Sequence, residues 1–312
     1  MEIISFPKDS SQIRWHQTVL ALGNFDGFHR GHLKIIDRVR QRANKLGVTP
    51  AVLTFDPHPS RVVRPDKAPL LLMTRKQWLE AMDQAGMRAV GFLHFTPEVS
   101  RWEPDVFVRT VLVEWLRVAE VWVGANFLFG HERSGNFSVL RSLGMQYGFR
   151  TEKLDPVRYK DFVVSSSRIR RLINEGEVNE AGALLGHHYF IDGTVNRGEG
   201  RGKSQGFPTA NICTENELLP PQGVYASLVT LNKVIYRSVT NVGVRPTFGS
   251  TGQIVVETHI FDLVRDLYGS RLRLSFIQRL RGEQIFSSVD ALVTQIKVDC
   301  EQARKLFDKI SL

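Results

Sequence analysis

The chain has few of the features that mark secreted, zinc-binding or membrane proteins. Its 312 residues include only two cysteines, Cys213 and Cys300, which lie far apart, so we expect neither a disulfide framework nor a cysteine zinc site. No apolar run approaches the roughly 18 residues of a membrane-spanning helix, and residues 1–11 lack the basic and then apolar layout of a signal peptide. These features predict a cytoplasmic protein without a membrane partner.

Acidic residues are in the minority. Lys and Arg number 41 against 32 Asp and Glu, which gives a formal net charge of +9. Such a balance attracts nucleic acid or a small anionic substrate. The basic residues form neither a long run nor a patch interleaved with aromatic residues, and their excess is spread over both halves of the chain. We therefore expect anionic small-molecule substrates and no nucleic-acid partner, and the oligomeric state stays open.

Length and pattern predict two globular domains of different class. A chain of 312 residues exceeds one typical domain, and a hydrophobic content of 42% is enough for real cores. Strand-like and helix-like segments alternate from residue 18 to about 185, and short strand-like runs follow. This indicates an α/β domain with a parallel sheet over residues 1–185 and a small antiparallel β-barrel with a closing helix over residues 186–312.

The expected elements can be placed along the chain. In the first domain we expect strands at 18–22, 51–55, 89–93, 120–124 and 150–154, and helices at 33–46, 75–85, 104–116, 137–147 and 179–185. In the second domain we expect strands at 189–195, 223–231, 233–240, 254–261 and 272–280, and a closing helix from residue 288.

A glycine-rich segment, Gly23-Asn24-Phe25-Asp26-Gly27-Phe28-His29-Arg30-Gly31-His32, joins the first expected strand to the first expected helix. Its glycines let the backbone turn tightly and approach a ligand, and the N–H groups that begin the helix favour an anion. His29 and His32, three residues apart, lie on one face of the first turn and suit a phosphate chain. On spacing alone, a metal-binding pair or two surface histidines remain alternatives.

The complete string is more specific than its parts. It resembles the HxGH superfamily of nucleotidyltransferases, in particular the GxFDGxHxGH signature of bacterial FMN adenylyltransferases, the first half of bifunctional riboflavin kinase/FAD synthetases. The resemblance implies a Rossmann-like nucleotidyltransferase domain in which His29 and His32 are catalytic. It also implies ATP contacts from Gly23, Asn24, Phe25, Asp26, Gly27 and Gly31.

Three further segments fall where expected strands end or a helix begins, at 54–59, 124–130 and 164–170. On residue types alone they are turn residues, a hydrophobic loop that closes the core, and a serine helix cap. The resemblance implies flavin contacts from Asp56, His58, Asn126 and Phe127, ATP contacts from Ser165, Ser166 and Ser167, and a catalytic role for Arg170 on the leaving pyrophosphate. The chain departs from the family at Asn126 and Leu128, where many members carry Asp and Arg.

A second set of motifs lies in the expected barrel. The segment Gly206-Phe207-Pro208-Thr209-Ala210-Asn211 resembles the G-F-P-T-A-N motif of riboflavin kinases. The resemblance implies that Thr209 and Asn211 ligate Mg²⁺ on ATP, and both are neutral hard oxygen donors of the kind that suits Mg²⁺. It also implies ATP contacts from three residues of the preceding glycine-rich segment: Gly198, Gly202 and Lys203. By composition that segment could equally be a flexible loop, and it departs from the family at Arg197 and Gln205.

The remaining motif residues lie on later expected strands. Val256-Glu257-Thr258-His259-Ile260 resembles a V-E-x-H-x segment whose glutamate is the catalytic base of riboflavin kinases. A structural ion pair is the alternative for Glu257 taken by itself. The resemblance also implies flavin contacts from Arg245, within an N-x-G-x-R-P-T-F-like segment, and from Arg281.

The motifs of the two halves thus predict two consecutive reactions. ATP with Mg²⁺ would phosphorylate riboflavin to FMN, and a second ATP would adenylylate FMN to FAD with release of pyrophosphate. One alternative is a flavin-sensing or RNA-associated binding module that has lost its chemistry, but the histidine pair, Thr209 and Glu257 are all present. Another is a cytidylyl- or pantetheine-phosphate-type transferase, against which the barrel half argues.

Overall fold

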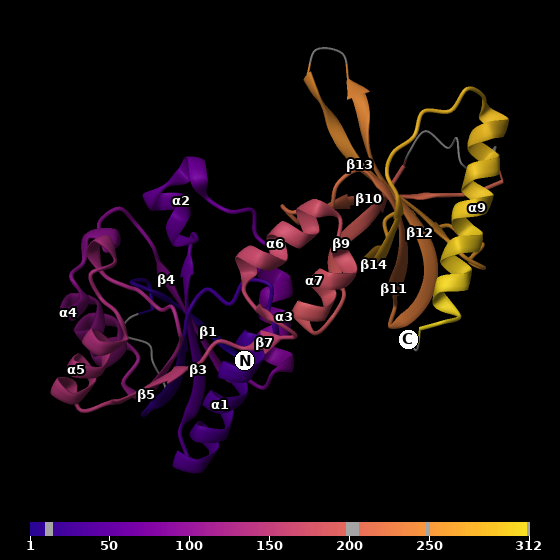
Figure 1. Cartoon of the computed structure of the whole chain (residues 1–312). Coiled ribbons are helices and arrows are strands. Elements are labelled where there is room, and N and C mark those ends of the chain that lie inside the picture. Colours follow the sequence, from indigo (N-terminus) through magenta and orange to yellow (C-terminus); the bar gives the residue numbers. More distant parts are fainter. Residues whose placement is uncertain (10–14, 198–205, 248–249, 311–312) are drawn as a thin grey trace. The chain divides into compact units, whose positions relative to one another are not determined.

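The computed structural model describes residues 1–9, 15–197, 206–247 and 250–310 (Figure 1). Contacts divide the chain into two compact units. The first comprises Met1–Leu71 and Arg75–Val164, and the second comprises Leu72–Thr74 and Ser165–Leu312. Each unit has its own sheet.

The first unit is built on a parallel six-stranded sheet with the order β1-β4-β3-β2-β5-β6. The strands are β1 (Glu2–Phe6), β2 (Thr18–Leu22), β3 (Thr49–Asp56), β4 (Ala89–His94), β5 (Val118–Gly124) and β6 (Arg150–Leu154). Every residue of β2 is buried, as expected for a central parallel strand covered on both faces. The strand order changes direction at β2, which pairs with β3 on one side and β5 on the other. In such sheets ligands bind at this reversal, beyond the carboxyl ends of the strands.

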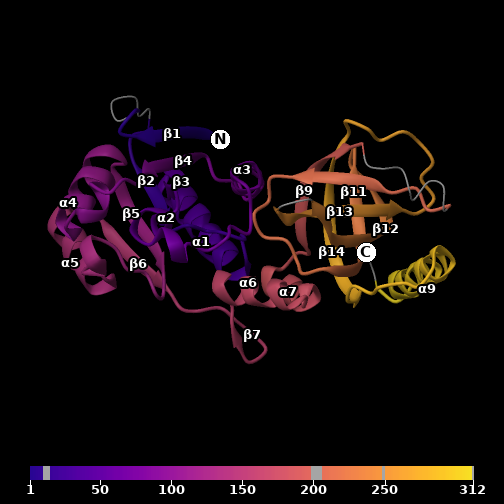
Figure 2. The same ribbon diagram turned by 90° about the horizontal axis from the view of Figure 1, so that it is seen from above.

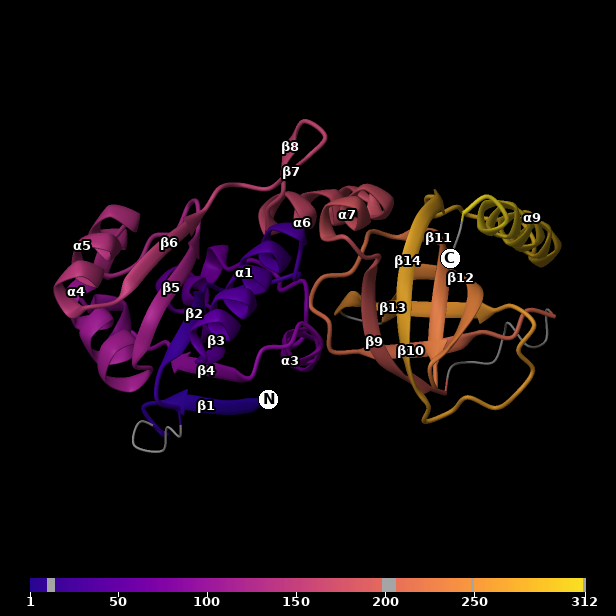
Figure 3. The same cartoon turned by 90° about the horizontal axis from the view of Figure 1, so that it is seen from below.

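Helices cover both faces of this sheet (Figure 3). On one face α1 (Arg30–Leu46) packs on β2, β3 and β5 through buried aliphatic residues such as Ile36 and Val39. On the other face lie α4 (Pro104–Phe107), its π-helical continuation η3 (Val108–Trp115), and α5 (Phe137–Tyr147). Shorter elements complete the unit: α2 (Pro59–Val63), η1 (Pro65–Lys67), α3 (Arg75–Gln84), η2 (Val99–Arg101), η4 (His131–Arg133) and a hairpin of β7 (Arg158–Tyr159) with β8 (Phe162–Val163).

The second unit is a closed antiparallel barrel with the strand order β10-β13-β12-β11-β14-β9 (Figure 2). Its strands are β9 (Tyr189–Asn196), β10 (Ala210–Thr214), β11 (Gly223–Leu231), β12 (Val234–Thr247), β13 (Ser250–Ile260) and β14 (Arg271–Arg281). The helix α9 (Val289–Phe307) begins at a Ser288 cap and packs on β12, β11 and β14. Two more helices, α6 (Ser166–Glu175) and α7 (Val178–Leu185), join the barrel because α6 packs on α7 and α7 packs on β14 and β9.

The expected architecture is confirmed in both halves: a parallel sheet with helices, an antiparallel barrel and a closing helix. The features that were not expected include the strands β1 and β10, the β7–β8 hairpin and the short helices α2, η1, η2 and η4. The contact division falls near residue 165, about one helical pair before the expected boundary at 186, because α6 and α7 bury their apolar faces within the barrel unit. In the described ranges, no helix has both the length and the apolar content needed to cross a membrane.

Candidate active sites

The turn that follows β2 is held in an unusual backbone conformation. Phe25, Gly27 and Phe28 have positive φ angles of 52°, 84° and 42°. Only glycine adopts such angles without strain, so the two phenylalanines need support from packing. Their side chains supply it, because both are buried in the core of the unit. The turn therefore delivers the start of α1 in a fixed position.

His29 and His32 form a stacked pair at the start of α1. His29 is the N-cap residue, and its Nδ1 accepts a hydrogen bond of 3.3 Å from the backbone N–H of His32. The ring centroids lie 3.5 Å apart with an angle of 18° between the planes. A Cβ on Gly31 would lie 3.1 Å from Cε1 of His29, so a side chain at this position would press on the His29 ring.

The pair meets the requirements of an anion site. The first turn of α1 contains no acidic residue, and the helix end itself favours negative charge. His29 is only 6% exposed, whereas His32 is half-buried. His32 is thus the more accessible ring, and His29 orients the turn that carries it.

The loop after β3 is tied to the histidine turn. Nδ1 of His58 accepts a 3.2 Å hydrogen bond from the N–H of Ser60, and its Nε2 lies 3.0 Å from the side-chain amide of Asn24. The Asn24 atom at this distance is the amide nitrogen Nδ2, so the two side chains connect the two loops. Asp56 pairs with Arg75 at 2.6 Å. The structure thus brings Asn24 and His58 together, and flavin contacts from Asp56 and His58 stay predictions.

The loop after β5 combines packing with exposure. Phe127 stacks on buried Phe129 with ring centroids 5.3 Å apart and packs against the core, which confirms that this loop closes the core. Asn126 and Leu128 are exposed. Since β5 is the neighbour of β2 at the strand reversal, these side chains lie on the edge of the sheet where ligands bind. Flavin contacts from Asn126 and Phe127 stay predictions.

The serine segment begins α6. The hydroxyl of Ser165 accepts a 3.3 Å hydrogen bond from the N–H of Arg168, so the expected helix cap is confirmed for this residue. Ser166 and Ser167 occupy the first turn, and Arg170 is half-buried one turn later. ATP contacts from the three serines and the catalytic role of Arg170 stay predictions.

On the barrel, strand register brings the kinase motif residues together. Glu257 on β13 lies opposite Asn211 on β10 and opposite Asn241 on β12. Directly opposite residues of an antiparallel pair point to the same face. The alternate residues Val242 and Val256 are buried, so the row of Asn211, Glu257 and Asn241 lies on the outer face of the barrel.

The segment that contains Thr209 is held by His259, a residue to which the sequence motifs assigned no role. Nδ1 of His259 donates a 2.9 Å hydrogen bond to the carbonyl of Pro208, and Phe207 packs edge-on against the same ring at 5.4 Å. His259 lies two residues after Glu257 and therefore on the same face of β13. This spacing was the signal that could have marked His259 as the anchor of the Phe207–Thr209 segment.

Arg281 is held by a buried carboxylate. Its Nε and Nη2 donate hydrogen bonds of 2.9 to 3.1 Å to Asp299 of α9, which also accepts one from Gln295. Asp299 is 2% and Arg281 16% exposed. Arg281 therefore links β14 to α9, and a direct flavin contact from it stays a prediction. Of the other predicted residues, Gly198, Gly202 and Lys203 lie outside the described residues, as does the side chain of Arg245.

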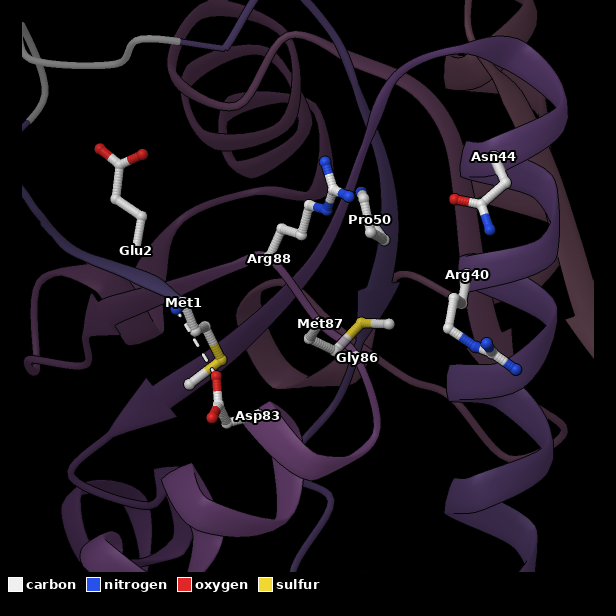
Figure 4. Close-up of a pocket in the computed structure, with 9 residues that line it drawn as sticks. All are labelled: Met1, Glu2, Arg40, Asn44, Pro50, Asp83, Gly86, Met87 and Arg88. Atoms are coloured by element: carbon white, nitrogen blue, oxygen red, sulfur yellow. Dashed lines mark ion pairs between the residues drawn. The ribbon is translucent and has the colours of Figure 1, made fainter.

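The cavity shown in Figure 4 has a volume of about 620 Å³ and lies away from these residues. It opens where β1, β3 and β4 begin, at the amino edge of the sheet, opposite the histidine turn. We give it no part in either reaction, because parallel sheets bind ligands at the carboxyl edge. Its lining residues are Met1, Glu2, Arg40, Asn44, Pro50, Asp83, Gly86, Met87 and Arg88.

Comparison with known proteins also divides the chain into an N-terminal and a C-terminal part. Residues 11–168 match the family model of FAD synthetase, and residues 185–307 match that of riboflavin kinase. A bifunctional riboflavin kinase/FMN adenylyltransferase from Pseudomonas fluorescens is 37% identical over 288 residues, which cover 92% of each chain. The proteins of the same description from Escherichia coli K12 and Bacillus subtilis are each 33% identical, over 98% and 94% of both chains.

Among solved structures, a crystal structure described as a macrolide-efflux protein from Streptococcus pneumoniae has a similar fold. It superimposes with a TM-score of 0.87 at 27% sequence identity, over 97% of this chain and 99% of that one. The likeness extends over both units.

Proposed function

The chain belongs to the bifunctional riboflavin kinase/FMN adenylyltransferase family, and we propose how its residues divide the two reactions between the two units. The protein phosphorylates riboflavin to FMN and adenylylates FMN to FAD. The observation that carries our assignment is the register that sets Asn211 beside Glu257 on the outer face of the barrel, next to the Thr209 segment. A carboxylate beside two neutral oxygen donors is the arrangement that a kinase step requires.

In the kinase step, Glu257 accepts the proton of the riboflavin 5′-hydroxyl as that oxygen attacks the γ-phosphorus of ATP. The bond from the γ-phosphorus to the bridging oxygen breaks, and ADP leaves. A primary alcohol is a poor nucleophile at neutral pH, so a base in contact with it accelerates the reaction. Glu257 is half-buried on a strand within the sheet, which fixes the direction of its carboxylate.

The donor set on β10 fits Mg²⁺ that arrives with ATP. The Thr209 hydroxyl and the Asn211 amide oxygen are uncharged hard ligands, and Mg²⁺ usually takes few protein ligands and shares the rest with phosphate and water. Thr209 and Asn211 would hold the ion, which neutralises charge on the phosphate oxygens. His259 keeps Thr209 in place through the Pro208 carbonyl.

In the adenylyl step, a phosphate oxygen of FMN attacks the α-phosphorus of ATP and pyrophosphate leaves. The nucleophile is already an anion, so no base is needed. His32, His29 and the N-terminus of α1 stabilise the negative charge that builds up on the phosphates. Arg170 adds a guanidinium to the leaving pyrophosphate, and Ser165, Ser166 and Ser167 contact the ATP phosphates.

Other features of the proposal follow from the substrates. All three substrates are small molecules, so neither nucleic acid nor a membrane takes part. We assign the protein to the cytoplasm, since both reactions consume ATP and the two cysteines lie far apart in the sequence.

The proposal is tested by product analysis with metal titration. Purified protein with riboflavin, ATP and Mg²⁺ should form FMN first and FAD afterwards. Asn211→Ala should raise the Mg²⁺ concentration for half-maximal FMN formation by about 10-fold or more, while the metal dependence of FAD formation from supplied FMN stays unchanged. An unchanged requirement in both steps would contradict the assignment of Asn211.

A further inference from the structure

Four hydroxyl side chains lie inside the barrel, directly behind the proposed kinase site. They are fully buried and come from three adjacent strands: Ser227 on β11, Ser238 and Thr240 on β12, and Thr258 on β13. Neighbouring interior positions on the same strands, such as Val229 and Val242, carry apolar side chains. The hydroxyls are therefore a polar group within an apolar interior.

The four hydroxyls form one connected chain of hydrogen bonds. The hydroxyl oxygen of Ser227 lies 2.8 Å from that of Ser238 and 2.7 Å from that of Thr240. Thr240 donates a 2.9 Å hydrogen bond to Thr258, whose hydroxyl donates one of 3.4 Å to the carbonyl of Val239. Ser238 donates a 2.9 Å hydrogen bond to the carbonyl of Ser227. Each buried hydroxyl therefore has a partner, as burial of a polar group requires.

The bond between Thr240 and Thr258 lies back to back with two residues of the outer row. Strand register pairs Thr240 with Thr258, and the next pair along the strands is Asn241 with Glu257. Successive side chains of a strand point to opposite faces, so the threonines point into the barrel and the other pair points outward. The bond thus joins β12 and β13 at the residue next to the proposed base.

Stability alone does not account for this chain. Replacing both partners of a buried hydrogen bond by apolar groups of the same shape is nearly neutral for stability, and valine has the shape of threonine. Apolar packing is non-directional, whereas a hydrogen bond fixes the distance and the angle between its groups. A fully satisfied polar chain therefore holds adjacent strands in one relative position more strictly than apolar side chains would.

We propose that Thr240 and Thr258 are positioning residues of the kinase step, which hold the backbone of β13 so that the carboxylate of Glu257 stays directed at the riboflavin hydroxyl. The proposal rests on the role of Glu257 as the base. A base must lie within about 2.6 to 3.2 Å of the group whose proton it accepts, and a misplacement of about 1 Å can cost about 100-fold in rate. Neither threonine touches a substrate, because both act through the strand that carries Glu257.

The test replaces both threonines by valine. Thr240→Val/Thr258→Val should melt close to the wild type, since both partners of the bond are removed together. It should lower kcat of FMN formation by about 10-fold and leave the KM values for riboflavin and ATP unchanged. Thr258→Ser keeps the hydroxyl and should retain the wild-type kcat.

A second comparison places the valine pair in the Glu257→Gln background. There it should cause almost no further loss of FMN formation, because the base that the threonines position is already absent. A general disturbance of the barrel would slow both backgrounds by the same factor. If the valine pair does not fold at the assay temperature, Thr258→Val alone is compared in the same two backgrounds.

The matched control is Ser238→Ala, which removes a fully buried hydroxyl of the same chain and leaves the Thr240–Thr258 bond in place. It should keep the wild-type kcat even where it melts earlier, and FAD formation from supplied FMN should be unchanged in all variants.

Three results would overturn the proposal and leave the chain a structural role: a wild-type kcat in the valine pair, an equal loss in both backgrounds, or the same loss in Ser238→Ala. If Glu257→Gln formed FMN at the wild-type rate, the proposed role of Glu257 in the kinase step would fail instead.

Discussion

The two units build their sites from different parts of a fold. In the first unit the proposed site lies at the end of a parallel sheet, where a strained turn places two stacked histidines at a helix N-terminus. In the second unit the proposed site lies on the surface of an antiparallel barrel, where strand register aligns Asn211, Glu257 and Asn241 across three strands. The first site presents N–H donors, and the second presents oxygen acceptors.

This difference follows from the nucleophile that each site serves. The phosphate of FMN is already an anion, so the first site needs only to stabilise the charge of the transition state. The hydroxyl of riboflavin is neutral, so the second site needs a carboxylate to remove its proton. Variants that remove one kind of group should therefore affect one reaction only.

The largest effect is expected for Glu257→Gln. The substitution keeps the size of the side chain and most of its hydrogen bonding, but it removes the base. FMN formation should fall by roughly 10²- to 10⁴-fold, the usual range of general base catalysis. Single-turnover FMN formation from riboflavin measures the effect.

A melting curve separates this account from the structural alternative for Glu257. If the residue were only an ion-pair partner, the variant would melt earlier and the folded fraction would turn over normally. That outcome would end the assignment of Glu257 as the base.

The counterpart in the first unit is His32→Ala. FAD formation from supplied FMN should fall by about 10²-fold or more, because a donor to the developing phosphate charge is lost. Riboflavin phosphorylation should remain nearly intact. Initial rates with each flavin measure both reactions, and an equal loss of both in a folded variant would contradict separate sites.

A smaller effect is expected for His259→Ala, which removes the hydrogen bond to Pro208 and the packing against Phe207. The Thr209 segment should lose its fixed position, so the Mg²⁺ requirement of FMN formation should rise by about 10-fold, as expected for a residue that orients a ligand. Titration of FMN formation with Mg²⁺ measures the change. Thr294→Ala, on the exposed surface of α9, serves as a control without expected effect.

The smallest effect on catalysis is expected for the boundary between the units. A fragment of residues 186–312 should phosphorylate riboflavin without forming FAD, but it lacks α6 and α7. Their buried residues, including Ile169, Leu172, Val178 and Leu185, contribute about 1.5 to 3 kcal/mol each when fully buried. A fragment of residues 165–312 should therefore melt at a higher temperature and turn over at a similar rate. Equal melting temperatures would show that the helices add nothing to the barrel.

Sequence pattern predicted most of the fold because its signals are local. Strand β2 is a continuous apolar run, and Ser288 caps α9 as the pattern of the closing helix indicated. The misses are segments without a strong local pattern. Strand β1 is a sheet-edge strand with only one fully buried residue, and β10 has only five residues directly after the Thr209 motif.

The candidate sites were predictable in composition and only partly in arrangement. Motif resemblance named His29, His32, Thr209, Asn211 and Glu257, but the stacking of the histidines depends on a backbone turn that no residue pattern specifies. Likewise, the hydrogen bond from His259 to Pro208 joins residues about fifty positions apart. The hydrogen bonds from Arg281 to Asp299 could not be predicted without knowing where α9 packs. Such long-range contacts arise from tertiary structure.

The most direct test of separate sites is a measurement of both half-reactions in both variants under single-turnover conditions. Riboflavin and FMN are supplied separately with ATP and Mg²⁺, and FMN and FAD are quantified for Glu257→Gln and for His32→Ala. The account predicts opposite losses: Glu257→Gln forms FAD from FMN at the wild-type rate and almost no FMN, and His32→Ala does the reverse. A variant that melts like the wild type and loses both reactions would contradict the division of chemistry between the two units.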